Sequence, residues 1–158
     1  RVHCIMSKAA ELAKWESFIN PRAFLVTLAA QQSNLAINTN HTIVFGTEIF
    51  DHGGNFASNT FTAPVTGTYQ FNVSLYLKQL DTATGYYQVD IATSNRSYEN
   101  IVDPTGQGAD VDFMTVAISA LADMDANDTA FVRIGIPNSG AAQLDVATPS
   151  FFSGFRVS

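Results

Sequence analysis

The sequence predicts an all-β fold in which many short strands pack as a sandwich or barrel. In Gly67–Leu77 (GTYQFNVSLYL), apolar and polar residues alternate along the whole run, which is the pattern of a strand with one buried face. Clusters of Gly, Pro, Asn and Ser separate the apolar runs at short intervals. The chain is 46% hydrophobic and 14% charged, a composition that favours a packed core over disorder.

The length of 158 residues suits one domain. We expect residues 1–20 to form a leader and residues 21–158 to form the folded domain. Cys4 is the only cysteine, so no disulfide can form within the chain and the fold depends on packing or on partners. Few cysteines are more typical of a cytosolic, bacterial or viral protein than of a small secreted animal domain.

The formal net charge is −6, and the absence of any cluster of basic residues excludes nucleic acid as an expected partner. No run of apolar residues is long enough for a membrane span, and the N-terminal residues do not have the pattern of a signal peptide. Met6-Ser7-Lys8 has the composition of a natural start. We therefore expect residues 1–5 to be an extension, or the chain to be a fragment.

Residues 7–19 are the only segment with a helical pattern. Ser7 can cap a helix, and Leu12, Trp15 and Ile19 form an apolar stripe at spacings of three and four. Pro21 then prevents the helix from continuing. Two interpretations remain open, which are a loosely docked leader and a segment for attachment or trimerisation.

The rest of the chain is predicted to form strands. Alternating or β-branched runs lie at residues 22–29, 42–45, 67–77, 86–93, 111–121, 129–136 and 150–157. In the clearest of them, residues 69, 71, 73, 75 and 77 face one way. Residues 103–110 and 138–148 are rich in Gly, Asp, Asn or Ala and are expected to be flexible loops.

Aromatic, glycine and acidic residues between positions 45 and 71 have the spacing of a family signature. They are Phe45, Asp51, Phe56, Phe61, Gly67, Tyr69 and Phe71. This arrangement resembles the C1q family signature, and Phe152-Ser153-Gly154-Phe155 is similar to the closing strand of that family. The gap between Phe56 and Phe61 is four residues where six are usual, and Val73 replaces an expected aromatic.

Further segments extend the resemblance over residues 21–158. Pro21–Phe24 is similar to the opening strand of the family, and Asn127-Asp128 stands where the family usually has Gly-Asp. The resemblance implies a ten-stranded jelly-roll sandwich of the C1q/TNF type that assembles as a homotrimer.

Some aromatic residues of the signature have two interpretations. We expect Phe45, Phe71 and Phe155 in the core of one subunit. For Tyr69 and Phe24, the core and the trimer axis remain equal alternatives.

A second resemblance concerns the leader. Residues 6–13 (MSKAAELA) resemble the opening of phage virion proteins, especially tail-associated ones. Together the two resemblances predict a non-enzymatic, homotrimeric virion protein that serves host attachment or assembly on a phage tail fibre, tail tip or capsid surface. Its partners would be further copies of itself, other virion proteins and a host-surface protein or glycan. The alternative is a secreted C1q/TNF-like ligand of a receptor or glycan.

Catalytic motifs are missing from the sequence. The only histidines are His3, His41 and His52, and no nucleophile elbow, P-loop or His-Glu-x-x-His motif occurs. His41 and His52 are expected in exposed loops. A hydrolase assembled from distant loops remains the third hypothesis.

No cofactor and no metal ligand set is predicted. His3 and Cys4 are only two ligands, and residues 123–128 lack the Gly and Glu that an EF-hand requires, so this segment is expected to form a turn. Calcium remains open, because some C1q-like trimers bind it near the apex or axis. Candidate oxygen donors are Asp51, Asp103, Asp110 and Asp112.

Five residues are candidates for contacts with a sugar or a protein. They are Tyr86, Tyr87, Asn95, Tyr98 and Asn100. Tyrosines and amides suit such surfaces because they combine apolar area with hydrogen-bonding groups. Roles within strands and turns explain the same residues equally well.

Overall fold

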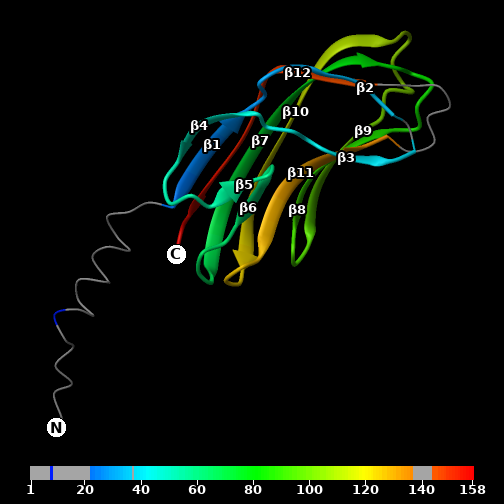
Figure 1. Cartoon of the computed structure of the whole chain (residues 1–158). Helices are drawn as coiled ribbons and strands as arrows, with labels where there is room; N and C mark the ends of the chain where they lie inside the picture. Colours follow the sequence, from blue (N-terminus) through cyan, green and yellow to red (C-terminus); the bar gives the residue numbers. More distant parts are fainter. Residues whose placement is uncertain (1–7, 9–21, 37, 137–143) are drawn as a thin grey trace.

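The computed structural model describes Lys8 and residues 22–36, 38–136 and 144–158. Two antiparallel β-sheets face each other across one core (Figure 1). Twelve strands lie in these residues: β1 (Ala23–Thr27), β2 (Gln32–Leu35), β3 (Asn40–Thr42), β4 (Thr47–Asp51), β5 (Phe56–Ala57), β6 (Thr60–Thr62), β7 (Gly67–Leu80), β8 (Tyr87–Thr93), β9 (Ser97–Val102), β10 (Val111–Met124), β11 (Thr129–Gly135) and β12 (Leu144–Arg156). The predicted helix at residues 7–19 lies outside the described residues, except for Lys8.

The strand order defines the two layers. The first sheet has the order β10-β7-β12-β1-β4, with β2 beside β12. The second sheet has the order β5-β6-β11-β8-β9, with β3 beside β11. The predicted all-β jelly-roll sandwich is therefore confirmed, with twelve strands among the described residues where ten were expected.

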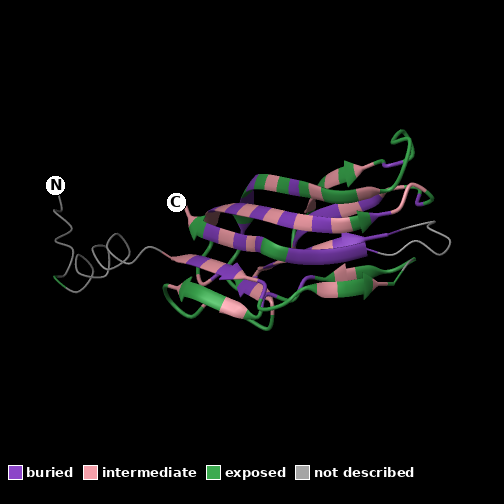
Figure 2. Ribbon diagram, turned by 90° about the horizontal axis from the view of Figure 1, so that it is seen from above, coloured by how far each residue is buried: buried purple, intermediate pink, exposed green. Residues whose placement is uncertain are grey.

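β7 lies between β10 and β12 in the first sheet and shows the predicted alternation. Tyr69, Phe71, Val73, Leu75 and Leu77 are all buried, while the residues between them are partly exposed. The banded colouring of the strands in Figure 2 displays the same period. One face of β7 thus forms the core, and the other face is the outer surface of the first sheet.

Phenylalanine rings fill the core between the two sheets. The Phe24 ring stacks on Phe56 and Phe61 at centroid distances of 5.0 and 5.1 Å, and it meets Phe152 edge-on at 5.0 Å. Phe71 packs against Phe61 and Phe152 at 5.5 and 5.8 Å. These contacts join β1, β7 and β12 of the first sheet to β5 and β6 of the second, so the aromatic cluster connects the two sheets.

The predicted strand at 42–45 and the predicted loop at 138–148 are both corrected. Only Thr42 lies in a strand, β3. Ile43 nevertheless donates its backbone N–H to Val132 O at 2.9 Å, which keeps this segment beside β11. Residues 144–148 belong to β12, and residues 138–143 lie outside the described residues.

The β12 strand is interrupted by a register shift between Ala147 and Phe151. The Ser150 hydroxyl spans this irregularity: it accepts the Tyr76 backbone N–H at 2.8 Å and donates to Ala147 O at 2.6 Å. A side chain thus replaces ladder hydrogen bonds where the register changes.

The free edge of β10 is covered by side chains from the other sheet. Asn95, Tyr98 and Asn100 donate to the backbone carbonyls of Asp123, Leu121 and Ala117 at 2.9, 3.3 and 3.2 Å. Unpaired strand edges are templates for aggregation. Hydrogen bonds from β9 and the turn before it therefore protect the edge of the first sheet.

Of the helical residues that the structure describes, none belongs to a helix long and apolar enough to cross a membrane.

Candidate functional site

Most of the signature aromatics lie inside the protomer. Phe24, Phe45, Phe61, Tyr69, Phe71 and Phe152 are buried, and Phe56 is half-buried against them. Of the two locations considered for Tyr69 and Phe24, the structure places both in the core. The Tyr69 hydroxyl donates to Val65 O at 2.7 Å, so its polar end is satisfied within the subunit.

Phe155 is the exception, because it lies on the outside instead of in the core. Its side chain is 45% exposed. In β12, Phe152 and Gly154 point inward, so Phe155 points outward. A core position for Phe155 would require a register shift of one residue, which the buried Phe152 prevents.

The glycine and acidic positions of the signature shape turns and close contacts. A Cβ on Gly67 would lie 2.1 Å from Ser158 O, and a Cβ on Gly154 would lie 2.6 Å from the Phe71 ring. The Asp51 carboxylate accepts the Phe56 backbone N–H at 2.8 Å. Asn127 has a φ of 75°, a conformation that Gly and Asn adopt more readily than other residues, which explains why Asn stands where the family usually has Gly.

The outer face of the first sheet carries large exposed apolar side chains. Leu121, Gln70, Phe155 and Ala23 form one cross-strand row, and Leu121 is 57% exposed. Phe113 is 58% exposed. Its ring stacks on the Tyr76 ring at 5.9 Å and lies 5.8 Å from Lys78 Nζ, and Phe50 adds a further exposed ring on β4. Exposed apolar patches of this kind mark protein interaction sites.

The predicted ligand-facing residues do not gather in one place. Tyr87 is completely buried, and its hydroxyl accepts the Asp81 backbone N–H at 2.8 Å. It therefore belongs to the core, because the alternation of β8 turns it inward. Asn95, in the turn before β9, and Tyr98 and Asn100, in β9, direct their side chains to the edge of β10. Tyr86 lines a cavity on the second sheet.

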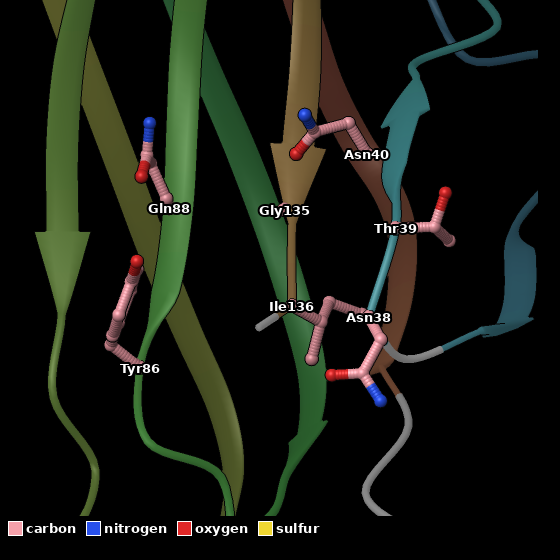
Figure 3. Close-up of a pocket in the computed structure, with 7 residues that line it drawn as sticks. All are labelled: Asn38, Thr39, Asn40, Tyr86, Gln88, Gly135 and Ile136. Carbon is pink, nitrogen blue, oxygen red and sulfur yellow. The ribbon is translucent and has the colours of Figure 1, made fainter. Parts of the chain in front are cut away.

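This cavity lies on the outer face of the second sheet and has a volume of about 370 Å³. Figure 3 shows its lining, which comes from β8, β11 and β3 together with the residues beside them: Asn38, Thr39, Asn40, Tyr86, Gln88, Gly135 and Ile136. Sequence reasoning missed Asn40, Gln88 and Gly135. The one available signal was Gly135 near the end of an otherwise apolar strand pattern, since an isolated glycine in a strand marks a close approach or an irregularity.

A buried ion pair borders the cavity. Asp90 is 1% exposed, and its carboxylate binds Arg133 Nε from the facing position on β11. Gln88 Nε2 donates to the other carboxylate oxygen at 2.9 Å. Both oxygens of Asp90 thus have partners, as a buried charge requires.

The acidic residues show no arrangement for a metal. Within residues 22–36, 38–136 and 144–158, no cluster of three or more His, Cys, Asp or Glu residues is placed to bind an ion. Asp123 and Met124 end β10, and residues 125–128 form the predicted turn, in which Asp125 N donates to Asp128 Oδ2 at 2.8 Å. Hydrogen bonds from Thr105 and Thr82 lower the pKa values of Asp103 and Asp110, respectively.

The histidines are engaged separately. His41 is half-buried in β3, not in a loop as expected, and its Nε2 lies 2.7 Å from Ala36 O. His52 is exposed, and its ring stacks on Phe50 at 4.9 Å. Neither pairs with a serine or cysteine nucleophile in the hydrogen bonds of the described residues. His3 and Cys4 lie outside these residues.

Comparison with known proteins agrees with the fold and the signature. The model of the C1q domain family matches residues 23–157. This chain belongs to the C1q domain family. The match covers every strand from β1 to β12 and begins two residues after the predicted boundary at residue 21.

Solved structures share the fold of this C1q domain at low sequence identity. The globular domain of a zebrafish complement 1qA protein is 15% identical and has a TM-score of 0.63, with 87% of this chain and 98% of that chain covered. Murine APRIL is 10% identical and has a TM-score of 0.55, with 85% and 99% covered. A search of curated protein sequences finds no significant match.

Proposed function

We propose that this C1q domain is a non-enzymatic binding module that assembles as a homotrimer through the outer face of its first sheet. The observation that supports this assembly is the outer face itself, where Leu121, Phe113 and Phe155 are each at least 45% exposed. Stable obligate interfaces are apolar and bury on the order of 2,000 Å² or more. Domains of the C1q/TNF type are typically trimeric binding modules, which supports the same conclusion.

The driving force is removal of this apolar surface from water, at roughly 25 cal/mol per Å². Phe113 adds its stacked partner Tyr76, so an aromatic pair and not an isolated ring would be covered. Hydrogen bonds between Gln70, Asn72 and Ser119 satisfy the polar side chains at the centre of this face. Burial of this face would therefore leave few polar groups without a hydrogen-bond partner.

A charge placed on this face tests the trimer. Leu121→Glu should convert the trimer into protomers, because an unpaired carboxylate cannot be buried in an apolar interface. Ile101→Glu is the matched control, since Ile101 is 55% exposed but lies on β9 in the second sheet. Sedimentation velocity distinguishes the outcomes. A wild-type chain that sediments as a lone protomer at micromolar concentration would contradict the proposal.

For the place of action, we propose a virion, with the trimer on a phage tail fibre, tail tip or capsid surface, where it serves host attachment or decoration. Two sequence features support this: the likeness of residues 6–13 to the opening of tail-associated virion proteins, and the single cysteine. Three identical heads would gain avidity on a repetitive host surface. Mass spectrometry of purified virions from the phage that encodes the gene should detect the chain, and its absence there would exclude this role.

A secreted C1q/TNF-like ligand of a receptor or glycan is the second candidate. It is favoured by the similarity to the globular domain of a zebrafish complement protein. The genes beside the coding sequence discriminate the two, because tail or capsid genes favour the virion. A signal peptide encoded ahead of Arg1 favours secretion.

A further inference from the structure

The cavity on the second sheet contains a glycine that lies between two carboxamide side chains. Gln88, Gly135 and Asn40 lie side by side on β8, β11 and β3 in one cross-strand row. Only the middle residue lacks a side chain, so a notch opens between two carboxamides. Figure 3 shows Gln88 and Asn40 on either side of Gly135. We call this feature the carboxamide notch.

The floor of the carboxamide notch is backbone. A Cβ on Gly135 would lie 2.6 Å from Asn40 Oδ1, so the Asn40 side chain leans over the glycine. Its carboxamide has no hydrogen-bond partner among the residues that the structure describes. Asn40 can therefore offer both a donor and an acceptor to a ligand above Gly135.

Gln88 is held in one orientation. Its Nε2 donates to Asp90 Oδ1 at 2.9 Å, and Asp90 is fixed in turn by Arg133. The carboxamide oxygen of Gln88 is thus the atom left to accept a hydrogen bond in the notch. Such a preset acceptor lowers the entropic cost of binding.

The charges around the notch select a neutral ligand. None of the described residues that line it is Asp, Glu, Lys, Arg or His, and Asp90 and Arg133, in the next row of the same face, form an ion pair with each other. An anion or a cation would find no counter-charge there. A purely apolar ligand would leave the two carboxamides unpaired, which costs free energy.

Tyr86 completes the chemistry of the notch. It is half-buried, and Figure 3 shows its ring on the same side of β8 as Gln88, with the hydroxyl toward the Gln88 carboxamide. The site thus combines an aromatic face and a hydroxyl with carboxamide groups that can donate and accept hydrogen bonds. This combination is complementary to a ring that carries hydroxyl groups on its edge and C–H groups on its face.

We propose that the carboxamide notch binds an uncharged sugar ring, such as a hexose or N-acetylhexosamine at the end of a glycan. The site lies within one protomer and deepens the proposed function, which depends on the trimer only for avidity. Its position favours presentation. β1 starts beside the end of β12, at one pole of the domain. β11 runs away from that pole and ends at Gly135, so its end lies near the opposite pole (Figure 1).

Saturation-transfer NMR on the full chain tests the site. The probes are the methyl glycosides of glucose, galactose, mannose and N-acetylglucosamine, with the glycosides of glucuronic acid and sialic acid as charged comparators. At least one neutral glycoside should show transfer. Gln88→Ala and Asn40→Ala should each weaken its binding by roughly fivefold, the effect of one lost hydrogen bond.

Gly135→Ala provides a second variant, because its methyl group displaces only the flexible end of Asn40 and fills the notch. It should reduce binding at unchanged thermal stability. Gln107→Ala is the matched control, since Gln107 is an exposed amide in the loop after β9. It should bind like the wild type.

The proposal would be overturned if no neutral glycoside showed transfer, or if only the charged comparators did. It would also be overturned if all three notch variants bound the glycoside as tightly as the wild type. Sedimentation of the same samples reports assembly separately. A protein that binds the glycoside as a protomer would refute the trimer and support the notch, and a trimer without binding would do the reverse.

Discussion

At the scale of single residues, Gly154 shows how tightly the aromatic core is packed. A Cβ at this position would lie 2.6 Å from the Phe71 ring and 2.8 Å from the Phe24 ring. Both rings are buried and cannot move aside freely. Gly154→Ala should therefore lower the free energy of unfolding by about 1–3 kcal/mol, the usual cost of overpacking a core.

Urea denaturation measures this loss, and Gly106→Ala is the control. No atom lies within 4 Å of a Cβ on Gly106, so that change should alter the free energy of unfolding by no more than about 0.5 kcal/mol. Equal stability of the two variants would mean that the rings around Gly154 can rearrange without cost.

Two buried tyrosines make the fold sensitive to alkaline pH. Burial is the main cause that raises the pKa values of Tyr69 and Tyr87 above the ordinary value of 10.0. The folded state thus favours the protonated phenol. Its contribution to stability is complete below the unfolded pKa near 10.0 and is lost as the pH rises through the higher folded value.

The free energy of unfolding should consequently fall above about pH 10. Tyr69→Phe should weaken this fall and, because it also removes the hydrogen bond to Val65 O, cost about 1 kcal/mol at neutral pH. A pH titration of the ultraviolet absorbance of tyrosinate follows ionisation directly. Tyrosines that all ionise at their ordinary pKa in the native protein would contradict this expectation.

At the scale of elements, the side chains that cover the edge of β10 give a specific prediction. Tyr98→Phe combined with Asn100→Ala removes two of the three bonds to its carbonyls. The pair of changes should cost about 1–2 kcal/mol in the free energy of unfolding and promote aggregation at the uncovered edge. Denaturation and light scattering at rising protein concentration check both effects.

Glu99→Ala serves as the control for this experiment, because Glu99 lies on β9 between the two residues and is exposed. It should aggregate no more than the wild type. Aggregation by the control as well would assign the effect to β9 itself and not to the bonds on β10.

The elements that sequence patterns predicted well are those with one fully buried face. β7 alternates over its length, and β8, β10 and β11 each carry enough inward apolar residues to be recognised. Sequence patterns missed β2, β4, β5, β6 and β9, because these strands are short or mostly exposed and no period can be recognised in them. Their positions depend on pairing with distant strands.

The candidate sites were harder to predict than the fold. Tyr86 and Tyr87 are adjacent in the sequence, yet the pleat sends one to the notch and the other to the core. The carboxamide notch depends on the register of three strands that are far apart in the chain. Spacing within one strand cannot reveal such a row, whereas the C1q signature lies mostly within one continuous segment.

At the scale of the whole molecule, the proposed trimer predicts that stability depends on concentration. When folding is coupled to assembly of a trimer, the melting temperature rises with protein concentration by mass action. The wild-type protein should show this rise in differential scanning calorimetry, and Leu121→Glu should lose it. A melting temperature independent of concentration in the wild type would contradict coupling between folding and assembly.

The pairing of β1 with β12 has a practical consequence. Ala23 lies opposite Phe155, and the Ser158 carbonyl accepts the Thr68 backbone N–H at 3.2 Å, so the folded region enters and leaves at neighbouring points. A unit of this kind can be spliced into a surface loop of an unrelated carrier without stretching either junction. Exchange of the whole domain between carrier proteins would then change the ligand that is bound, while the fold of the carrier stays the same.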